Sequence, residues 1–323
     1  MIAQLQRYAA TSPASGGHLG RCAGPWGRAM DSRAEFFAAL QAAGVAPARA
    51  SELVADGTLH RHRVQGDRPG TANGWHILRL DAPASGAGGS WRTEAAVRWC
   101  SKSQRQLSAS ERRALAERAR QEQAQRLIET YRQHKAAAER AAELWAKAKP
   151  ANKGHPYLVR KGIAAGIARQ YHGALALPVL TPAWQLASLQ FIDEQGSKRF
   201  LSGGLKKACF IPINGKPEAG KRLMLSEGWA TGSTLAGLYP GAVVLAACDA
   251  GNLLAASQET RKHWPGAELI IAGDFDAVGQ AKALQAAKET GAKILPVPEL
   301  PQGFTGTDWN DWQAFCRGVR HVA

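Results

Sequence analysis

The sequence predicts a mixed α/β protein whose centre is a parallel sheet with helices on both faces. After residue 220, apolar runs at 222–228, 242–248, 268–276 and 292–298 alternate with helical stretches at 230–238, 252–264 and 277–291. Apolar strands that alternate with helices of this length are typical of parallel sheets, in which the helices cover the two faces. We therefore place the sheet in a domain spanning 220–300, followed by an acidic C-terminal segment and tail at 301–323.

The segment before this sheet, 151–219, predicts a basic α+β subdomain. The runs ALPVL, LASLQFI and KACFIPI have the composition of strands and are joined by turns such as DEQGS. Nine of its side chains are Lys or Arg and three are acidic. This subdomain is expected to bind an anionic ligand.

A long linker helix is predicted over 104–150. Ser108 or Ser110 can cap its start, and no Gly or Pro interrupts the chain before Pro150. Large apolar side chains are sparse along it, so most of the helix is expected to lie in solvent, linking domains or lying along a partner.

The first hundred residues predict a small N-terminal domain at 31–103, with a helix from Met30 and β-rich pieces such as HRHRV and GWHILRL. Residues 1–30 are rich in Gly, Ala, Ser and Pro, and they are expected to be disordered or a non-native extension. His60, His62 and His76 have no Cys nearby, so we expect no zinc.

Composition excludes several classes of protein. The 323 residues contain no apolar run near 18 residues, and the N-terminus does not read as a secretory signal. The five cysteines are scattered singly, which argues against a disulfide framework and a cysteine zinc site. We expect a reduced, cytoplasmic protein with no membrane partner.

The charge points to a polyanionic partner. The chain carries 41 Lys and Arg against 26 Asp and Glu, a formal net charge of +15, and the whole surplus lies before residue 220. A surplus of this size favours nucleic acid or an acidic membrane surface. We therefore expect the first part of the chain to hold a polyanion, and the balanced part after residue 220 to bind something that carboxylates recognise.

Three acids follow the predicted parallel strands. Glu227 closes the first, and Asp274 and Asp276 close the third, at the sheet edge where such folds bind ligands. Side chains two apart in a strand point to one side, so the D-x-D spacing should place both aspartates together. Carboxylates that converge require a cation, and oxygen ligands favour Mg²⁺ or Mn²⁺. A D-x-D motif alone is compatible with ordinary surface charges; the additional Glu favours a metal site.

These motifs carry a resemblance to a known family. SEGWATGSTLAG and AGDFDAVGQAKA resemble the glutamate and D-x-D motifs of toprim domains, and HPYLVRKGI resembles the segment that opens the catalytic core of DnaG-type primases. LASLQFIDEQGSKRFLSGGLKKACFIP resembles the basic subdomain before toprim, and TGTDWNDW resembles the acidic segment after it. The stretch from GDRPGTANGWHIL to WC is similar to the front of primases of conjugative plasmids and integrated mobile elements, and the motifs together resemble primases of conjugative plasmids, phages and integrated mobile elements.

The resemblance implies a toprim-type sheet and a DNA primase, a DNA-directed RNA polymerase that serves the replication or transfer of a mobile element. Glu227, Asp274 and Asp276 would be catalytic and, with Asp308, would bind Mg²⁺ or Mn²⁺. Single-stranded DNA template and ribonucleoside triphosphates would be the partners, with a replicative helicase supplied by another protein. The implied nucleic-acid and nucleotide contacts are basic: Arg160, Lys161, Lys198, Arg199, Lys206 and Lys207.

The sequence departs from the family pattern at three points. The zinc ribbon of many DnaG-type primases is absent, Thr231 stands where replicative primases tend to have an acid, and Asn310 stands where they tend to have a second Asp. The second metal position is therefore open. Two other functions also remain open, a toprim nuclease that hydrolyses nucleic acid with the same metal and a non-catalytic single-stranded-DNA-binding protein.

Overall fold

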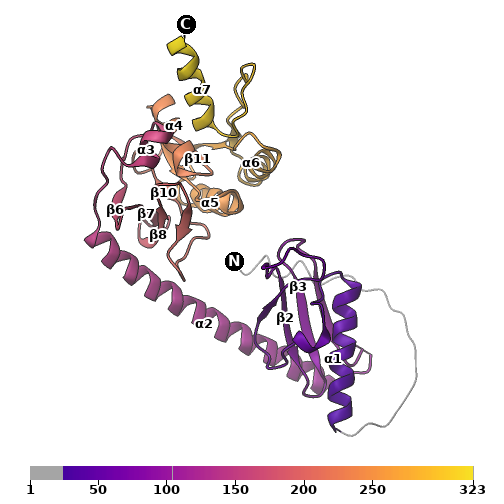
Figure 1. Cartoon of the computed structure of the whole chain (residues 1–323). Helices are drawn as coiled ribbons and strands as arrows, with labels where there is room; N and C mark the ends of the chain where they lie inside the picture. Colours follow the sequence, from indigo (N-terminus) through magenta and orange to yellow (C-terminus); the bar gives the residue numbers. More distant parts are fainter. Residues whose placement is uncertain (1–24, 104, 323) are drawn as a thin grey trace. The chain divides into compact units, whose positions relative to one another are not determined.

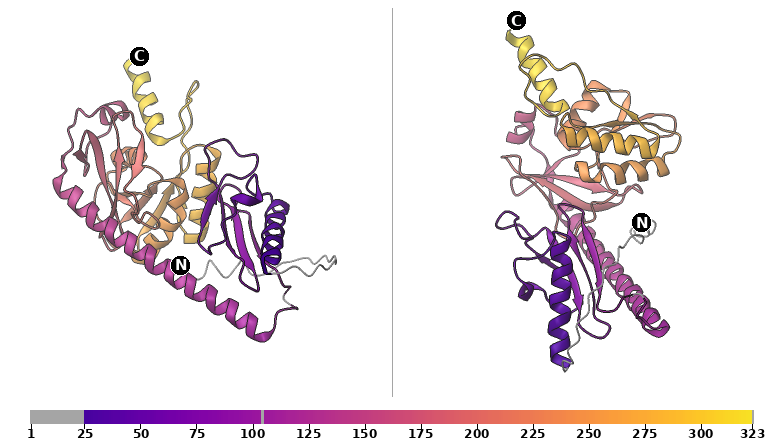
Figure 2. Two further views of the ribbon diagram at one scale, coloured as in Figure 1. Left: turned by 60° about the horizontal axis from the view of Figure 1, so that its bottom comes forward. Right: turned by 90° about the vertical axis from the view of Figure 1, so that its right-hand side faces the viewer.

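The computed structural model describes residues 25–103 and 105–322, in two compact units divided between Glu122 and Gln123. Each unit has its own sheets (Figures 1 and 2). The segment 1–30, expected to be disordered or non-native, lies mostly outside the described residues; its last six residues begin the first helix. No described helix combines the length and apolar character needed to span a membrane.

The first unit pairs one helix with a four-stranded antiparallel sheet, in the order β1-β2-β3-β4. Phe36 and Leu40 of the helix are fully buried against Leu78 of β2. A Cβ on Gly88 of β3 would lie 2.5 Å from Leu40, so the close approach of helix and sheet requires glycine there. The elements are α1 (Pro25–Ala42), a 3₁₀ turn (Ala50–Glu52), β1 (His60–His62), β2 (Gly74–Arg79), β3 (Ser85–Ser90) and β4 (Ala96–Cys100).

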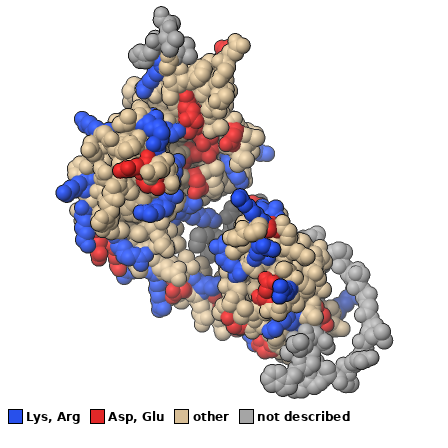
Figure 3. Space-filling view, in the orientation of Figure 1, with Lys and Arg blue, Asp and Glu red and all other residues tan. Residues whose placement is uncertain are grey.

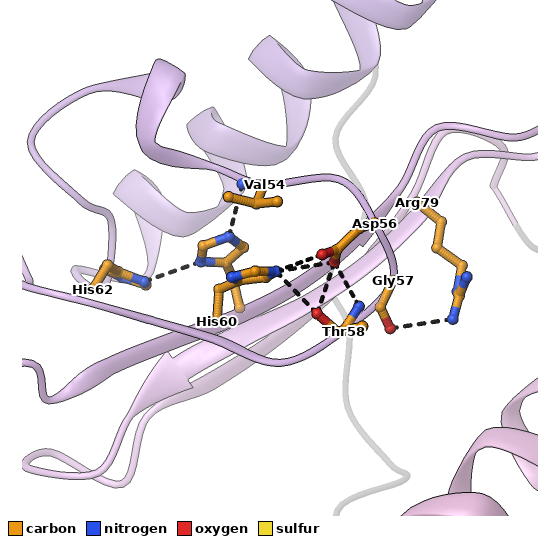
Figure 4. A network of polar contacts seen from close by, with 8 residues as sticks. Val54, Asp56, Gly57, Thr58, His60, His62 and Arg79 are labelled. Carbon is orange, nitrogen blue, oxygen red and sulfur yellow. Dashed lines mark hydrogen bonds and ion pairs between the residues drawn. The ribbon is translucent and has the colours of Figure 1, made fainter.

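Histidines form a polar network inside this unit (Figure 4). His62 Nε2 lies 2.9 Å from the carbonyl of Val45, and the Nδ1 atoms of His62 and His76 are 3.1 Å apart. The amide of Val54 donates to Nε2 of His76. One assignment satisfies every group: both rings are neutral, His76 donates from Nδ1, and His62 donates from Nε2.

The predicted long helix is α2 (Ala109–Lys147). Its start is a capping box, because Ser108 Oγ accepts from the amide of Glu111 while the Glu111 carboxylate accepts from the amide of Ser108. Only Ala137 and Ala141 are buried along it, as expected for a mainly solvated helix. These two small residues lie in its second half, where Ala141 packs on Leu189 and Phe191 of the next sheet.

The second unit begins with an antiparallel sheet in the order β5-β6-β7-β8-β9. Leu175, Leu177 and Ile192, on its two longest strands, are fully buried in a core shared with Trp229. The elements are β5 (Lys149–Pro150), α3 (Pro156–Lys161), β6 (Arg169–Tyr171), β7 (Ala174–Leu180), β8 (Leu186–Ile192) and β9 (Lys198–Phe200).

The parallel sheet with helices on both faces is confirmed. Its order is β10-β12-β11-β13-β14, and every pair except β10·β12 is parallel. Leu253 and Ala283 pack on one face, and Leu235 and Trp309 on the other. The elements are β10 (Ile211–Pro212), β11 (Arg222–Ser226), α4 (Trp229–Leu238), β12 (Ala242–Ala246), α5 (Ala250–His263), β13 (Glu268–Ala272), α6 (Ala277–Thr290), β14 (Lys293–Ile294) and α7 (Trp309–Val322).

Three strand predictions differ from the structure. Of the run at 292–298 only Lys293–Ile294 forms a strand. Of the run KACFIPI only Ile211–Pro212 forms a strand, which pairs with β12 of the parallel sheet, while Phe210 just before it forms a single β-bridge with Leu180 of β7. β13 ends at Ala272, before the D-x-D motif, because Gly273 begins the turn into α6. Both acids of the motif therefore lie in a loop, where the two-residue alternation of a strand does not apply.

Candidate active site

The predicted acids gather at the carboxyl edge of the parallel sheet. Glu227 follows β11, and Asp274 and Asp276 lie between β13 and α6. The amide of Phe275 donates to the carbonyl of Thr307 at 2.7 Å, which ties this loop to the segment that carries Asp308. The four acids therefore come from three separate stretches of chain.

Glu227 and Asp274 form the centre of the group. The backbone amide of Asp274 donates to Oε1 of Glu227 at 3.2 Å. Burial raises the pKa of Glu227; the hydrogen bond from Asp274 opposes the rise, and the charges of Asp276, Asp249 and Asp308 add to it. The first effect is desolvation, because Glu227 is a residue that is only 7% exposed.

Asp274 is the most perturbed acid. Burial, followed by the charges of Glu227, Asp308 and Asp276, raises its pKa to about 7, and Lys198 opposes the rise. Its Oδ1 is buried and has no hydrogen-bond partner among the described residues. A buried carboxylate oxygen without a donor is costly unless a cation or proton occupies the site.

Gly279 makes this packing possible. A Cβ at this position would lie 2.7 Å from Oε1 of Glu227 and 2.9 Å from the carbonyl oxygen of Asp274. Any side chain would displace one of the two acids. The glycine of the motif is therefore required by the close approach of α6 to the carboxylates.

Asp276 and Asp308 take part in helix caps. Oδ1 of Asp276 accepts from the amide of Gly279 at 2.7 Å, and Oδ1 of Asp308 accepts from the amide of Asp311 at 2.8 Å. Each cap uses one oxygen and leaves the second for another ligand. Among the described residues, no three Asp, Glu, His or Cys side chains lie close enough together to ligate one ion as they stand.

The six predicted basic residues differ in their relation to the acids. Lys198 is the one whose charge lowers the pKa of Asp274, and its Nζ lies 3.8 Å from where a Cβ on Gly228 would stand. Lys161 pairs with Asp311 at 3.0 Å, and Lys206 pairs with Asp249, the cap of α5. The face drawn in Figure 3 shows Lys and Arg bordering an acidic patch on this unit.

The remaining three basic residues make contacts elsewhere on the unit. Arg160 donates to the carbonyl of Glu194 and stands over the ring of Tyr157. Arg199 stands over the ring of Phe191, and Lys207 is exposed in a turn. These side chains are not brought to the acidic pair by any contact of the described residues.

Sequence reasoning missed Asn252. This buried side chain donates to the carbonyls of Lys206, Cys209 and Ala247, and its Oδ1 accepts from the amide of Ala208. It thereby fixes the loop that carries Lys206 and Lys207 to the start of α5. An Asn three residues after the capping Asp249 was the available signal, but its partners Lys206, Ala208 and Cys209 are more than forty positions away.

Asn310 and Tyr157 are structural in this arrangement. Asn310 is buried, and its amide donates to the carbonyl of Lys161 and to the hydroxyl of Thr234. Tyr157 is buried, and burial followed by the charge of Asp308 raises its pKa to about 12. The amide of Asn310 therefore links α3, α4 and α7 beside the acids.

Comparison with known proteins supports a relationship to DNA primases. The chain is 32% identical over 289 residues to an Escherichia coli protein named DNA primase TraC. This alignment covers 84% of this chain and 20% of that protein. It is 31% identical over 279 residues to a second Escherichia coli DNA primase TraC, covering 81% of this chain and 26% of that protein. The chain thus spans about a fifth to a quarter of the length of these relatives. No family model matches.

Solved primase structures are more distant. The primase fragment of the bacteriophage T7 primase-helicase protein aligns with a TM-score of 0.41 and 14% identity, over 54% of this chain and 78% of that one. A DnaG primase catalytic domain bound to single-stranded DNA aligns with a TM-score of 0.40 and 11% identity, over 59% of this chain and 80% of that one. The sequence relationship to DNA primases expected from the motifs is confirmed by the first two comparisons.

Proposed function

We propose that this chain, which is related over most of its length to DNA primases, synthesises short RNA primers on single-stranded DNA for the replication or transfer of a mobile element. In this reaction a ribonucleotide 3′ hydroxyl attacks the α-phosphate of the next ribonucleoside triphosphate, and pyrophosphate leaves. The single observation that carries the proposal is the Glu227–Asp274 pair, with its raised pKa values and an Asp274 oxygen that has no described partner.

The donor set fits a hard divalent cation. Glu227 and Asp274 would hold Mg²⁺ or Mn²⁺. Asp276 and Asp308 would each contribute the carboxylate oxygen that does not take part in the helix cap. When bound, such an ion lowers the pKa of a hydroxyl and neutralises charge on the transferred phosphate. Gly279 keeps the two central carboxylates together, and Asn252 holds the loop that carries Lys206 and Lys207.

The basic residues of 151–219 would bind the polyanionic substrates. Lys198 is the basic residue whose charge lowers the pKa of Asp274, and we assign it to the incoming triphosphate. Arg160, Arg199 and Lys207 would contact the template backbone, while Lys161 and Lys206 would exchange their carboxylate partners for phosphate or remain structural. Lysine and arginine contacts of this kind are salt-dependent and independent of base sequence. A helicase from another protein would supply unwound template.

A primer-synthesis assay on single-stranded DNA with labelled ribonucleotides tests the proposal. The wild-type chain should make short RNA in the presence of Mg²⁺ or Mn²⁺, Asp274→Asn should make none, and Glu299→Gln, which changes an exposed acid, should match wild type. A wild type that is inactive with either metal contradicts the proposal.

Two other outcomes identify the alternatives. Degradation of nucleic acid that needs metal but no added nucleotides would indicate a toprim nuclease. DNA binding without either reaction, together with in vivo function that Asp276→Asn leaves unchanged, would indicate a binding protein. No observation favours either alternative over primer synthesis. A nuclease would use the same acidic pair, and a binding protein would need no acidic pair.

A further inference from the structure

The face of the first unit's sheet that points away from α1 carries an aromatic and basic surface. In β2, His76 and Leu78 are buried on the α1 side, so Trp75 lies on the opposite side. The strand register places Arg61 of β1 and Gly89 of β3 beside Trp75 in one row across the sheet. Trp91 follows directly after β3. We call Arg61, Trp75 and Trp91 the Trp91 surface.

These three side chains pack against one another. The ring centroids of Trp75 and Trp91 are 6.2 Å apart, and the guanidinium carbon of Arg61 lies 4.8 Å from the centre of the Trp91 ring. A Cβ on Gly89 would meet the Trp75 indole at 2.9 Å, so the missing side chain lets this ring lie across β3. Arg61 also donates to the carbonyl of Ala72, and the Trp91 amide donates to the carbonyl of Asn73.

The Trp91 ring is open to solvent. Its side chain is 49% exposed, while Trp99, on the α1 side of the same sheet, packs against Phe36 in the core. Trp99 therefore supplies the core with an aromatic side chain from the α1 side of the sheet, and the Trp91 ring is not part of that core. Because its neighbours hold the half-exposed Trp91 side chain in place, a ligand that binds there would lose less free energy in restricting the side chain's rotation.

The charge around Trp91 favours an anionic ligand. Residues 57–103 contain seven Lys or Arg and three acids. Arg61, Arg63, Arg68 and Arg98 are exposed; Arg92 pairs with Asp67, and Arg79 pairs with Glu122 of α2. An exposed tryptophan together with unneutralised arginines provides both a ring for stacking and cations for phosphates.

We propose that the Trp91 surface binds single-stranded nucleic acid, with a base stacked on the Trp91 ring and Arg61 and Arg98 at neighbouring phosphates. Bases that are paired in a duplex present no free ring face, which selects single strands. The inference extends the proposed function by giving the first unit its own contact with the template. It does not depend on catalysis, and it stands if the acidic site proves to hydrolyse.

Fluorescence anisotropy with the full chain and a labelled oligothymidylate of about 16 nucleotides tests this surface. Trp91→Ala should weaken binding about 5- to 100-fold, the loss expected for one stacked base, while Trp91→Phe should retain most of the affinity. Arg61→Ala should reduce the slope of log K against log salt by about 0.7. Tyr131→Ala removes an aromatic that is 70% exposed on α2 and serves as the matched control.

Equal affinity of wild type, Trp91→Ala and Tyr131→Ala would overturn the proposal. The proposal would also be overturned if binding of anionic vesicles required Trp91 and binding of the oligonucleotide did not. Glu299→Gln, measured in the same assay, should bind like wild type. A Trp91-dependent affinity in a chain that makes no primer would retain this proposal and reject the polymerase, so the two failures are distinguishable. Thermal unfolding of each variant confirms that it is folded.

Discussion

The backbone amide of Asp274 donates a hydrogen bond to Oε1 of Glu227 across 3.2 Å, joining the loop after β13 to the end of β11. This bond stabilises the ionised form of a glutamate that burial pushes toward the neutral form. The Asp274 carboxyl, in contrast, has a buried Oδ1 with no described donor. The pair is therefore held in place by the backbone, and its charge is left for a ligand to compensate.

Replacing Asp274 should separate stability from activity. Its pKa is raised from 3.8 to about 7, so the folded chain binds the proton more tightly than the unfolded chain does. Stability therefore falls as pH rises from about 4 to 7. In EDTA at alkaline pH, Asp274→Asn should be more stable than wild type by up to about 4 kcal/mol, because each pKa unit corresponds to about 1.4 kcal/mol, and the gain should shrink in acid.

Urea unfolding at both pH values checks this difference. The same variant should be inactive in primer synthesis, and Glu299→Gln should change neither property. A loss of stability in Asp274→Asn that is equal at both pH values would show that this carboxyl is not destabilised by its surroundings.

Gly279→Ala should impair the site while leaving the sheet folded. The added methyl would lie 2.7 Å from Oε1 of Glu227, so the carboxylates must move apart. We expect primer synthesis to fall by at least about tenfold, the rate effect of roughly 1.4 kcal/mol. Gly237→Ala, at a position of the neighbouring helix α4 where a Cβ meets nothing, is the control. Activity of Gly279→Ala equal to that of the control would contradict the proposed packing.

Asn252→Ala should release the loop that carries Lys206 and Lys207. The change leaves the buried carbonyls of Lys206, Cys209 and Ala247, and the amide of Ala208, without this partner. Loss of a buried hydrogen-bonding side chain of this kind costs about 2 kcal/mol. Thermal unfolding measures the loss, and Gln258→Ala, exposed on the same helix, should cost much less. Equal losses would indicate that the loop is held by other contacts.

The histidine network makes the first unit sensitive to acid. Burial, followed by the charges of His62 and His60, lowers the pKa of His76 from 6.5 to about 4, while Asp56 opposes the change. The unfolded chain therefore binds more protons between these values, and stability falls as pH drops from 6.5 to about 4. Protonation would also remove the acceptor for the Val54 amide.

Hydrogen exchange at Val54, corrected for the intrinsic pH dependence, should report this loss as faster opening in acid. The exposed side chain of His263 provides a matched control, because His263→Gln should retain the pH dependence and His76→Gln should remove it. An unchanged profile in His76→Gln would assign the acid sensitivity elsewhere.

The sequence predicts elements well where the pattern is local. The apolar runs around β11, β12 and β13 each contain a strand, and the Ser108–Glu111 capping box begins the long helix at one of the two serines predicted to cap it. The D-x-D motif was placed at a strand end by composition, yet β13 ends earlier, since the turn into α6 needs Asp276 as its cap.

The contacts that shape the site are long-range, and this limits what the sequence reveals. Asn252 contacts a loop more than forty residues before it, and Lys161 pairs with Asp311 150 positions away. No periodicity encodes such partners. The convergence of Glu227 and Asp274 was predictable because parallel strands end at one edge of the sheet, whereas the use of Asp276 and Asp308 as caps depends on backbone geometry.

Manganese binding tests the central claim most directly. Electron paramagnetic resonance of the full chain titrated with Mn²⁺ should show saturable binding. Asp274→Asn and Glu227→Gln should each abolish this binding, and Glu299→Gln should leave it unchanged. The binding should weaken below pH 7 as Asp274 takes up its proton. Manganese binding that is equally strong in Asp274→Asn and in wild type would contradict the account, since the ion would then lie elsewhere on the protein.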